Sequence, residues 1–176
     1  MKKALQISFI SASGWLIILF CSCTKSPTES PIPQITLQSV QEVSYGQYYD
    51  SFNFVIGYQD GDGDIGLSQS DTTGEFNPSS IYYNNLYIDY YEKKGNKFAS
   101  VKPTLSAVDS VEWAYRMPVI STEGKNKSIK GTISFGILDI TPPPPGYYDS
   151  IMFKIYIYDR NLHKSNIVQS PVLVLQ

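Results

Sequence analysis

The sequence predicts an all-β fold, and three observations support this prediction. Apolar and polar residues alternate with a period of two over several short segments, these segments are rich in β-branched and aromatic residues, and Gly and Pro separate them. No segment carries the apolar stripe that an amphipathic helix needs. We therefore predict one β-rich domain that follows a short N-terminal region.

The alternation defines eight expected strands. It is clearest over residues 52–58, where three apolar positions and Tyr58 lie two residues apart, and it recurs over residues 86–90, 133–137 and 151–157. Seven to eight short strands in one domain are typical of a sandwich. We predict an immunoglobulin-like β-sandwich, with a small β-barrel as the alternative. The expected strands cover residues 35–43, 49–58, 81–92, 97–101, 113–120, 128–139, 150–158 and 166–175.

The N-terminus has the pattern of a secretory signal peptide. Lys2 and Lys3 precede an apolar stretch over residues 4–20, which several polar residues dilute. This stretch is a poor match to the run of about 20 apolar residues that spans a bilayer. A positive start, an apolar core and a small residue before the cleavage point predict a signal peptide over residues 1–22, and a retained anchor helix is the alternative.

The predicted cleavage point identifies one cysteine as a lipid acceptor. The string Phe20-Cys21-Ser22-Cys23 resembles the lipobox of bacterial lipoproteins, in which a small residue precedes the cysteine that receives diacylglycerol. Ser22 precedes Cys23, whereas the bulky Phe20 precedes Cys21, so Cys23 is the expected lipidation site. A disulfide between the two cysteines would be highly strained, because only one residue separates them. The resemblance implies an extracytoplasmic protein that a lipid anchors to the bacterial envelope, with the outer membrane as the expected location.

After cleavage the chain divides into a tether and one domain. Residues 23–34 contain the lipidated Cys and a stretch rich in Pro, Ser and Thr, which favours an extended chain of about 3.1 Å per residue. Residues 35–176 form the expected sandwich domain. The full chain has 14 basic and 16 acidic residues, and the loss of Lys2 and Lys3 changes its net charge from −2 to −4. An acidic domain without a basic stripe is unsuited to nucleic acid.

The most distinctive local motif is an acidic loop, Asp60-Gly61-Asp62-Gly63-Asp64-Ile65-Gly66. Its three carboxylates repel one another unless a positive charge lies among them, and the interleaved glycines allow the side chains to converge. Ca²⁺ prefers such a set of oxygen ligands. The EF-hand pattern does not fit, because Ile65 stands at its sixth position and no helices flank the loop. The alternative is a plain turn, since Asp-Gly is itself a hairpin signal.

The predicted topology brings a second loop to the first. In an immunoglobulin-like sandwich the B–C and F–G loops lie at the same end, and residues 49–58 and 150–158 are the expected strands B and F. Asp159 and Asn161 should therefore complete a Ca²⁺ site with Asp60, Asp62 and Asp64. Alternatively, Arg160 neutralises the acidic loop through a salt bridge. The same topology places Ile35 at this end and Pro144, in the proline loop over 141–146, at the opposite end.

Two loops carry a family resemblance. The DGDGDIG string after a strand, together with the turn from Asp159 to Asn166, resembles small lipoproteins of Bacteroidota-type bacteria. The second turn also resembles the F–G turn of bacterial immunoglobulin-like and cadherin-like modules, in which an Asp often serves calcium. Leu162 and His163 stand where that turn usually has Gly-Asn. The resemblance implies a location and a fold, and it carries no activity.

Tyrosine is unusually common, with 14 residues, and five of these lie between residues 82 and 91. Exposed aromatic side chains suit sugar rings or protein partners. The candidate ligand-binding residues are Tyr83, Tyr87, Tyr91 and Trp113. The alternative is that these tyrosines only pack on a half-buried sheet.

Catalytic chemistry finds little support in the sequence. His163 is the only histidine, and we expect it to be solvated in a loop. Zinc sites need several Cys or His ligands, which this chain lacks. We therefore predict a non-enzymatic lipoprotein, an interaction or adhesion module that calcium stiffens and whose partner is an unidentified protein or glycan. The alternative is a glycan-binding surface lipoprotein that uses the tyrosine-rich sheet face.

Overall fold

The computed structural model of the protein describes residues 29–44, 50–101, 111–120, 128–140 and 150–174. The predicted signal peptide, Cys23, the first part of the tether and the proline loop with Pro144 lie outside the described residues. Within the described ranges, no helix is long and apolar enough to cross a membrane.

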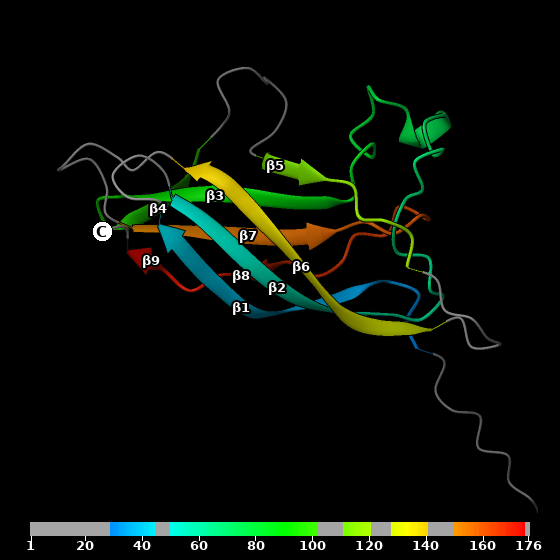
Figure 1. Ribbon diagram of the computed structural model, residues 1–176, viewed down its shortest axis with the longest axis horizontal. Coiled ribbons are helices and arrows are strands. Elements are labelled where there is room, and N and C mark those ends of the chain that lie inside the picture. Colours follow the sequence, from blue (N-terminus) through cyan, green and yellow to red (C-terminus); the bar gives the residue numbers. More distant parts are fainter. Residues whose placement is uncertain (1–28, 45–49, 102–110, 121–127, 141–149, 175–176) are drawn as a thin grey trace, which may run out of the picture.

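One sheet contains three long strands. β1 (Gln34–Ser44), β2 (Asp50–Asp60) and β6 (Ile129–Ile140) are antiparallel neighbours in the order β1-β2-β6. They run diagonally across the second sheet in Figure 1. Their bounds match the sequence expectation to within two residues at each end, because the period-two alternation covers most of each strand.

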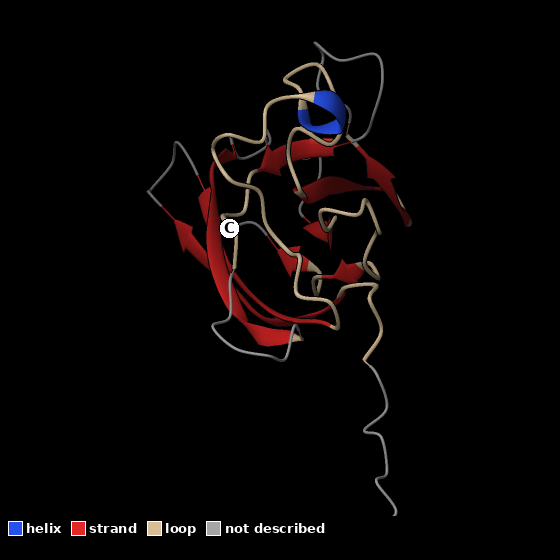
Figure 2. Ribbon diagram, turned by 90° about the vertical axis from the view of Figure 1, so that its right-hand side faces the viewer, coloured by secondary structure: helices blue, strands red, loops and turns tan. Residues whose placement is uncertain are grey.

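The second sheet is built around the antiparallel pair of β3 (Leu86–Lys94) and β7 (Ser150–Ile157). Two strands, β4 (Lys97–Ser100) and β5 (Val111–Tyr115), share the outer edge of β3. Two more, β8 (Val168–Gln169) and β9 (Leu173–Val174), share the outer edge of β7. The nine described strands therefore occupy seven positions. A single 3₁₀ turn, η1 (Gly74–Phe76), projects from the connection between β2 and β3 (Figure 2).

The all-β prediction is confirmed. The two antiparallel sheets are not closed into a barrel, so the barrel alternative is wrong. With β1, β2 and β6 as strands A, B and E, and with β3, β7 and β8–β9 as C, F and G, the strand order is that of an immunoglobulin-like sandwich.

The core lies between the sheets and is formed by alternate residues of the central strands. Phe54 of β2 and Phe153 of β7 are fully buried. Their rings pack edge to face with 5.2 Å between the ring centroids. Burying a side chain of this size stabilises the fold by about 1.5–3 kcal/mol. The other fully buried side chains at the centre are Phe52, Ile56, Ile88, Ile151 and Ile155.

Three expected strands are shorter or broken in the structure. The segment expected to begin at residue 81 enters β3 only at Leu86, after a turn in which Tyr83 N–H donates to Ser80. The segment 113–120 leaves β5 at Tyr115. The segment 166–175 divides at Ser170, whose hydroxyl accepts the Phe153 N–H at 2.9 Å, and at Pro171, which has no N–H to donate.

Both loops of interest lie at the end of the sandwich where β1 begins, at the right in Figure 1. Gln34 pairs with Gln59, and the Gly61 N–H donates to the Ser30 carbonyl at 2.9 Å. The side-chain amide of Asn166 accepts from the Ile35 N–H at 2.7 Å and donates to the Ile35 carbonyl at 2.9 Å. Ile35 thus lies beside both loops, as predicted from the strand order.

Candidate metal centre

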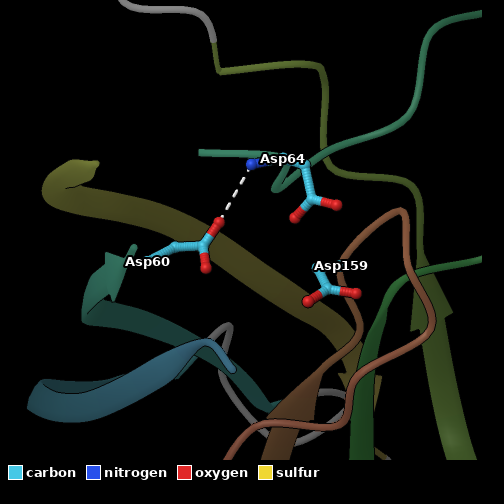
Figure 3. A group of neighbouring side chains, drawn as sticks. All are labelled: Asp60, Asp64 and Asp159. Atoms are coloured by element: carbon cyan, nitrogen blue, oxygen red, sulfur yellow. Dashed lines mark hydrogen bonds between the residues drawn. The ribbon is translucent and has the colours of Figure 1, made fainter. Parts of the chain in front are cut away.

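Three carboxylates from two separate loops converge at this end of the sandwich. Asp60 is the last residue of β2, Asp64 lies in the loop that follows, and Asp159 follows β7. One oxygen atom from each carboxylate lies within 4.8 Å of the others. Figure 3 shows the three side chains pointing toward a common space. The predicted meeting of the two loops is therefore observed.

A hydrogen bond within the acidic loop and two glycines hold the loop in its curved shape. The Asp64 N–H donates to Oδ2 of Asp60 at 2.9 Å (Figure 3), and Gly63 adopts a φ of 71°, which favours glycine. Gly66 has a φ of 103°, and a Cβ there would lie 2.1 Å from the Pro118 carbonyl oxygen. The loop has a specific fold that the interleaved glycines make accessible.

Ile65 anchors the loop to the core and joins it to the second loop. Its side chain is fully buried, its backbone forms a β-bridge with Asp159, and its carbonyl accepts the Ile120 N–H at 3.2 Å. The neighbouring Asp64 carbonyl accepts the Arg160 N–H, also at 3.2 Å. An apolar residue among the aspartates therefore places the acidic loop against Asp159.

Three buried carboxylate oxygens at this site have no hydrogen-bond partner. Asp60 is fully buried, and its Oδ1 atom has no donor; the same is true of the buried Oδ1 atoms of Asp62 and Asp64. Most buried polar atoms in folded proteins are hydrogen-bonded. A cluster of unsatisfied carboxylate oxygens is therefore an arrangement that a cation, or protons, would stabilise.

The pKa values of these carboxyl groups reflect the same conflict. Burial, followed by the charges of Asp159, Asp62 and Asp60, raises the pKa of Asp64 from 3.8 to about 7. Burial also raises the pKa of Asp60 and of Asp159, although hydrogen bonds from the Asp64 N–H and from His163 partly offset it. The unliganded site therefore binds protons more tightly than isolated carboxylates do.

The remaining two predicted ligands lie at the rim of the cluster. The side-chain amide of Asn161 donates to Oδ2 of Asp62 at 3.3 Å, and Asn161 is exposed. All five predicted residues thus lie in the two adjoining loops, and the oxygens of Asp60, Asp64 and Asp159 converge most closely.

His163 also contributes to this site, a role that the sequence did not lead us to predict. Its backbone N–H donates to Oδ1 of Asp159 at 2.7 Å, and its Nδ1 lies 2.9 Å from Oδ2. The bond to Asp159 and the charge of Asp159 raise the pKa of His163. The side chain is 41% exposed, so it is partly solvated while its Nδ1 contacts the buried carboxylate. The spacing of four residues from Asp159 within a turn was the available signal.

The turn that positions His163 carries one strained residue. Leu162 has a φ of 66°, the left-handed conformation that most side chains avoid. Glycine would adopt this conformation at little cost. The Leu162 N–H donates to the Asp159 carbonyl at 3.2 Å, so the turn closes over the residue that bears the buried carboxylate.

Arg160 does not neutralise the acidic cluster. Its guanidinium binds both carboxylate oxygens of Asp71, at 2.5 and 3.1 Å. The salt bridge to the acidic loop that the sequence left open as an alternative is therefore not formed with the three converging aspartates.

The candidate aromatic residues do not form one face. Trp113 packs on the inner side of the sheet against Tyr90 and Phe153, while Tyr83 lies in a loop beneath the guanidinium of Arg116. Tyr87 and Tyr91 alone share the outer face of β3.

The outer face of β3 and β7 is largely occupied by contacts within the chain. Tyr87 is only 7% exposed, stacks on Tyr156 and donates its hydroxyl to the Asn84 carbonyl at 2.6 Å. Burial, followed by the nearby Tyr158 and Tyr82, raises the pKa of Tyr87 to about 12. Lys154 lies over the Tyr91 ring at 4.5 Å, and Lys164 over the Tyr156 ring at 3.6 Å. The aromatic rings on this face are thus covered by one another and by lysines.

The donor set of the cluster is chemically hard. The three converging ligand atoms are all carboxylate oxygens, which suit Ca²⁺ or Mg²⁺, whereas a structural zinc site uses nitrogen and sulfur ligands. Comparisons with protein-family models, with curated proteins and with solved structures found no match for this chain.

Proposed function

We propose that the protein is a lipid-anchored extracytoplasmic lipoprotein, a non-enzymatic interaction or adhesion module whose membrane-proximal end is braced by Ca²⁺. Asp60, Asp62, Asp64 and Asp159 would supply carboxylate oxygens, and Asn161 would complete the rim. The lipid anchor rests on the sequence around Cys23, and the calcium site rests on the geometry of the two loops.

The observation that carries the calcium site is the unpartnered Oδ1 of Asp60. Asp60 is fully buried and faces Asp64 and Asp159, and no cationic side chain of the described residues lies at hydrogen-bonding distance from it. Leaving a buried carboxylate unpaired costs several kcal/mol unless it is protonated or neutralised. Ca²⁺ takes six to eight oxygens at about 2.3–2.6 Å, so a modest contraction of the loops would let one ion bind Asp60, Asp64 and Asp159 together.

The position of the site supports a bracing role. The end of the predicted tether crosses the acidic loop, because the Ser30 carbonyl accepts the Gly61 N–H and a Cβ on Gly61 would lie 2.3 Å from the Glu29 carbonyl oxygen. Asn166, at the end of the second loop, holds both backbone groups of Ile35. A cation shared by the two loops would therefore also hold the point where the tether enters the domain.

The outer face of β3 and β7 favours an interaction module over a tyrosine platform for glycans. A platform of that kind needs accessible aromatic rings, whereas Tyr87 and Tyr156 are at most 9% exposed. Lys154 and Lys164 lie over the neighbouring rings and interrupt the face with charge.

Hydrogen exchange of the full-length protein in detergent tests the bracing role. Peptides that cover residues 29–36 and 58–66 should exchange more slowly in millimolar Ca²⁺ than in chelator, and a peptide over 150–157 should be unaffected. Asp60→Asn should remove the difference. Equal exchange of residues 29–36 under the two conditions would contradict a brace at the tether.

A further inference from the structure

A groove of about 220 Å³ lies on the outer face of the β1–β2–β6 sheet, which is not the sheet that carries Tyr87 and Tyr91. All three strands of the sheet contribute to it. Its lining consists of Gln34, Thr36, Gln38, Gly57, Tyr58, Gln59, Lys130 and Gly131.

Two departures from regular strand structure shape the groove. Gly57 has no side chain, and the side chains of Thr36 and Gln38 close over it, since a Cβ there would lie 2.7 Å from Thr36 Oγ1 and 2.8 Å from Gln38 Nε2. The register of β1 against β2 shifts between Leu37 and Ser39, which places Gln38 in a β-bulge. Bulges re-aim side chains beside binding sites. The glycine and the bulge together let the Gln38 side chain lie across β2, where it lines the groove.

The lining of the groove combines neutral carboxamides with one positive charge. Gln34, Gln38 and Gln59 provide carboxamides, each a donor and an acceptor, and none of the three is engaged by another residue of the described chain. Lys130 is the single charged residue, and no carboxylate lines the groove. Such a set matches a ligand that presents several hydroxyl groups, each of which also donates and accepts, with room for one negative group at Lys130.

The geometry points to a saccharide-binding groove on this sheet, which would hold one sugar ring of a neutral or uronate-containing oligosaccharide. The volume lies below the range of about 300–1,000 Å³ that encloses drug-sized ligands, so it suits a single ring of a longer chain that continues along the open sheet. Gln38 and Gln59 would bind hydroxyl groups from opposite sides of Gly57, and Lys130 would pair with a ring carboxylate where one is present.

The groove lies close to the cation cluster, yet its binding does not depend on the cation. Gln59 and Lys130 are direct partners across β2 and β6, one position before the pair formed by Asp60 and Ile129. The side chains that line the groove are distinct from the proposed calcium ligands. The saccharide proposal can therefore fail while the calcium proposal stands, and the reverse also holds.

An array of neutral and uronate-containing oligosaccharides, probed with the full-length protein in detergent, provides the test. We expect retention of at least one oligosaccharide in Ca²⁺ and in chelator alike. Calorimetric titration with that sugar should show at least a tenfold loss of affinity in Gln38→Ala and in Gln59→Ala. Ser134→Ala, an exposed change on the same face of β6, should bind normally.

Two outcomes would overturn the proposal. One is an array on which no oligosaccharide is retained. The other is a bound sugar whose affinity is the same in Gln38→Ala, Gln59→Ala and the unmodified protein, since that sugar would occupy another surface. Melting temperatures of the variants should stay within about 2 °C of the parent protein, because exposed substitutions of this kind change stability by about 0.5 kcal/mol or less.

Discussion

Arg160 binds both carboxylate oxygens of Asp71, although Asp159, the residue just before Arg160, belongs to the aspartate cluster. The hydrogen bond from Arg160 is the main reason why the pKa of Asp71 lies well below its ordinary value, so Asp71 stays ionised. Asp71 is itself fixed, because its carboxylate accepts the Ser68 N–H at 2.7 Å and its carbonyl accepts from Arg116 at 3.0 Å. Asp71 thus keeps the nearest guanidinium away from the cluster.

This relationship predicts that Asp71 protects the cation site from an internal competitor. In Asp71→Asn the guanidinium of Arg160 loses its ionic partner while its backbone stays bonded to the Asp64 carbonyl. We expect Ca²⁺ affinity to fall by about threefold to tenfold, because a positive side chain is then free to approach the carboxylates. Titration calorimetry measures the change. The double variant Asp71→Asn/Arg160→Gln should recover the original affinity, and a double variant as weak as the single one would contradict this explanation.

The second prediction concerns pH. The folded state holds a proton on Asp64 up to pH 7 or so, since its pKa rises from 3.8 to about 7, whereas the unfolded chain releases that proton near pH 4. Folded molecules therefore bind more protons between these values, and the stability of the cation-free protein falls as pH rises through this window. The raised pKa of His163 acts in the same direction.

Thermal unfolding in chelator between pH 4.5 and 7.5 measures this effect. The melting temperature should decline across the window, and saturating Ca²⁺ should remove the decline by replacing the protons. Asp64→Asn should flatten the curve in chelator, whereas the exposed control Glu75→Gln should leave it unchanged. A melting temperature that rises with pH in chelator would show that the carboxylates are not buried together.

A third prediction uses the strained turn. Leu162 adopts a φ of 66°, which costs an L-residue about 1–2 kcal/mol and costs glycine little. Leu162→Gly relieves this strain, while Leu162→Ala keeps it, and both lose the same side-chain contacts to a similar degree. Leu162→Gly should therefore melt about 2–4 °C above Leu162→Ala. Equal melting temperatures would mean that the turn relaxes without cost.

The sequence predicted the strands well where a local rule determines them. Successive side chains of a strand point to opposite faces of the sheet. The spacing of Phe52, Phe54 and Ile56 therefore identified both the strand and its buried face. The meeting of Asp60 and Asp159 also followed, because strand order alone places the two loops at one end. These features depend on period and connectivity, which are visible in the sequence.

Features that depend on distant partners were not predictable in this way. The partner of Arg160 lies 89 residues away, and nothing in the local pattern favours Asp71 over the acidic loop. Tyr87 was expected on an accessible face, but stacking on Tyr156 and hydrogen bonding to Asn84 bury it. The groove beside Gly57 depends on the Thr36 and Gln38 side chains of the neighbouring strand, which the alternation within β2 does not show.

A fourth prediction tests the lipid anchor. Cys23→Ala should move the protein from the membrane pellet to the soluble fraction and should abolish labelling by a clickable fatty acid, because the acceptor thiol is gone. Cys21→Ala is the matched control and should keep both properties. If labelling survives in Cys23→Ala and disappears in Cys21→Ala, the acceptor is Cys21, and the cleavage point moves with it.

Calorimetric titration of the full-length protein in detergent measures whether one Ca²⁺ ion binds among Asp60, Asp64 and Asp159. We expect one ion per chain, together with stabilisation of about 2.7 kcal/mol when free Ca²⁺ exceeds the dissociation constant a hundredfold. Asp60→Asn should abolish the binding heat, and Glu75→Gln should preserve it. A titration without heat, together with identical melting in chelator and in millimolar Ca²⁺, would contradict the claim.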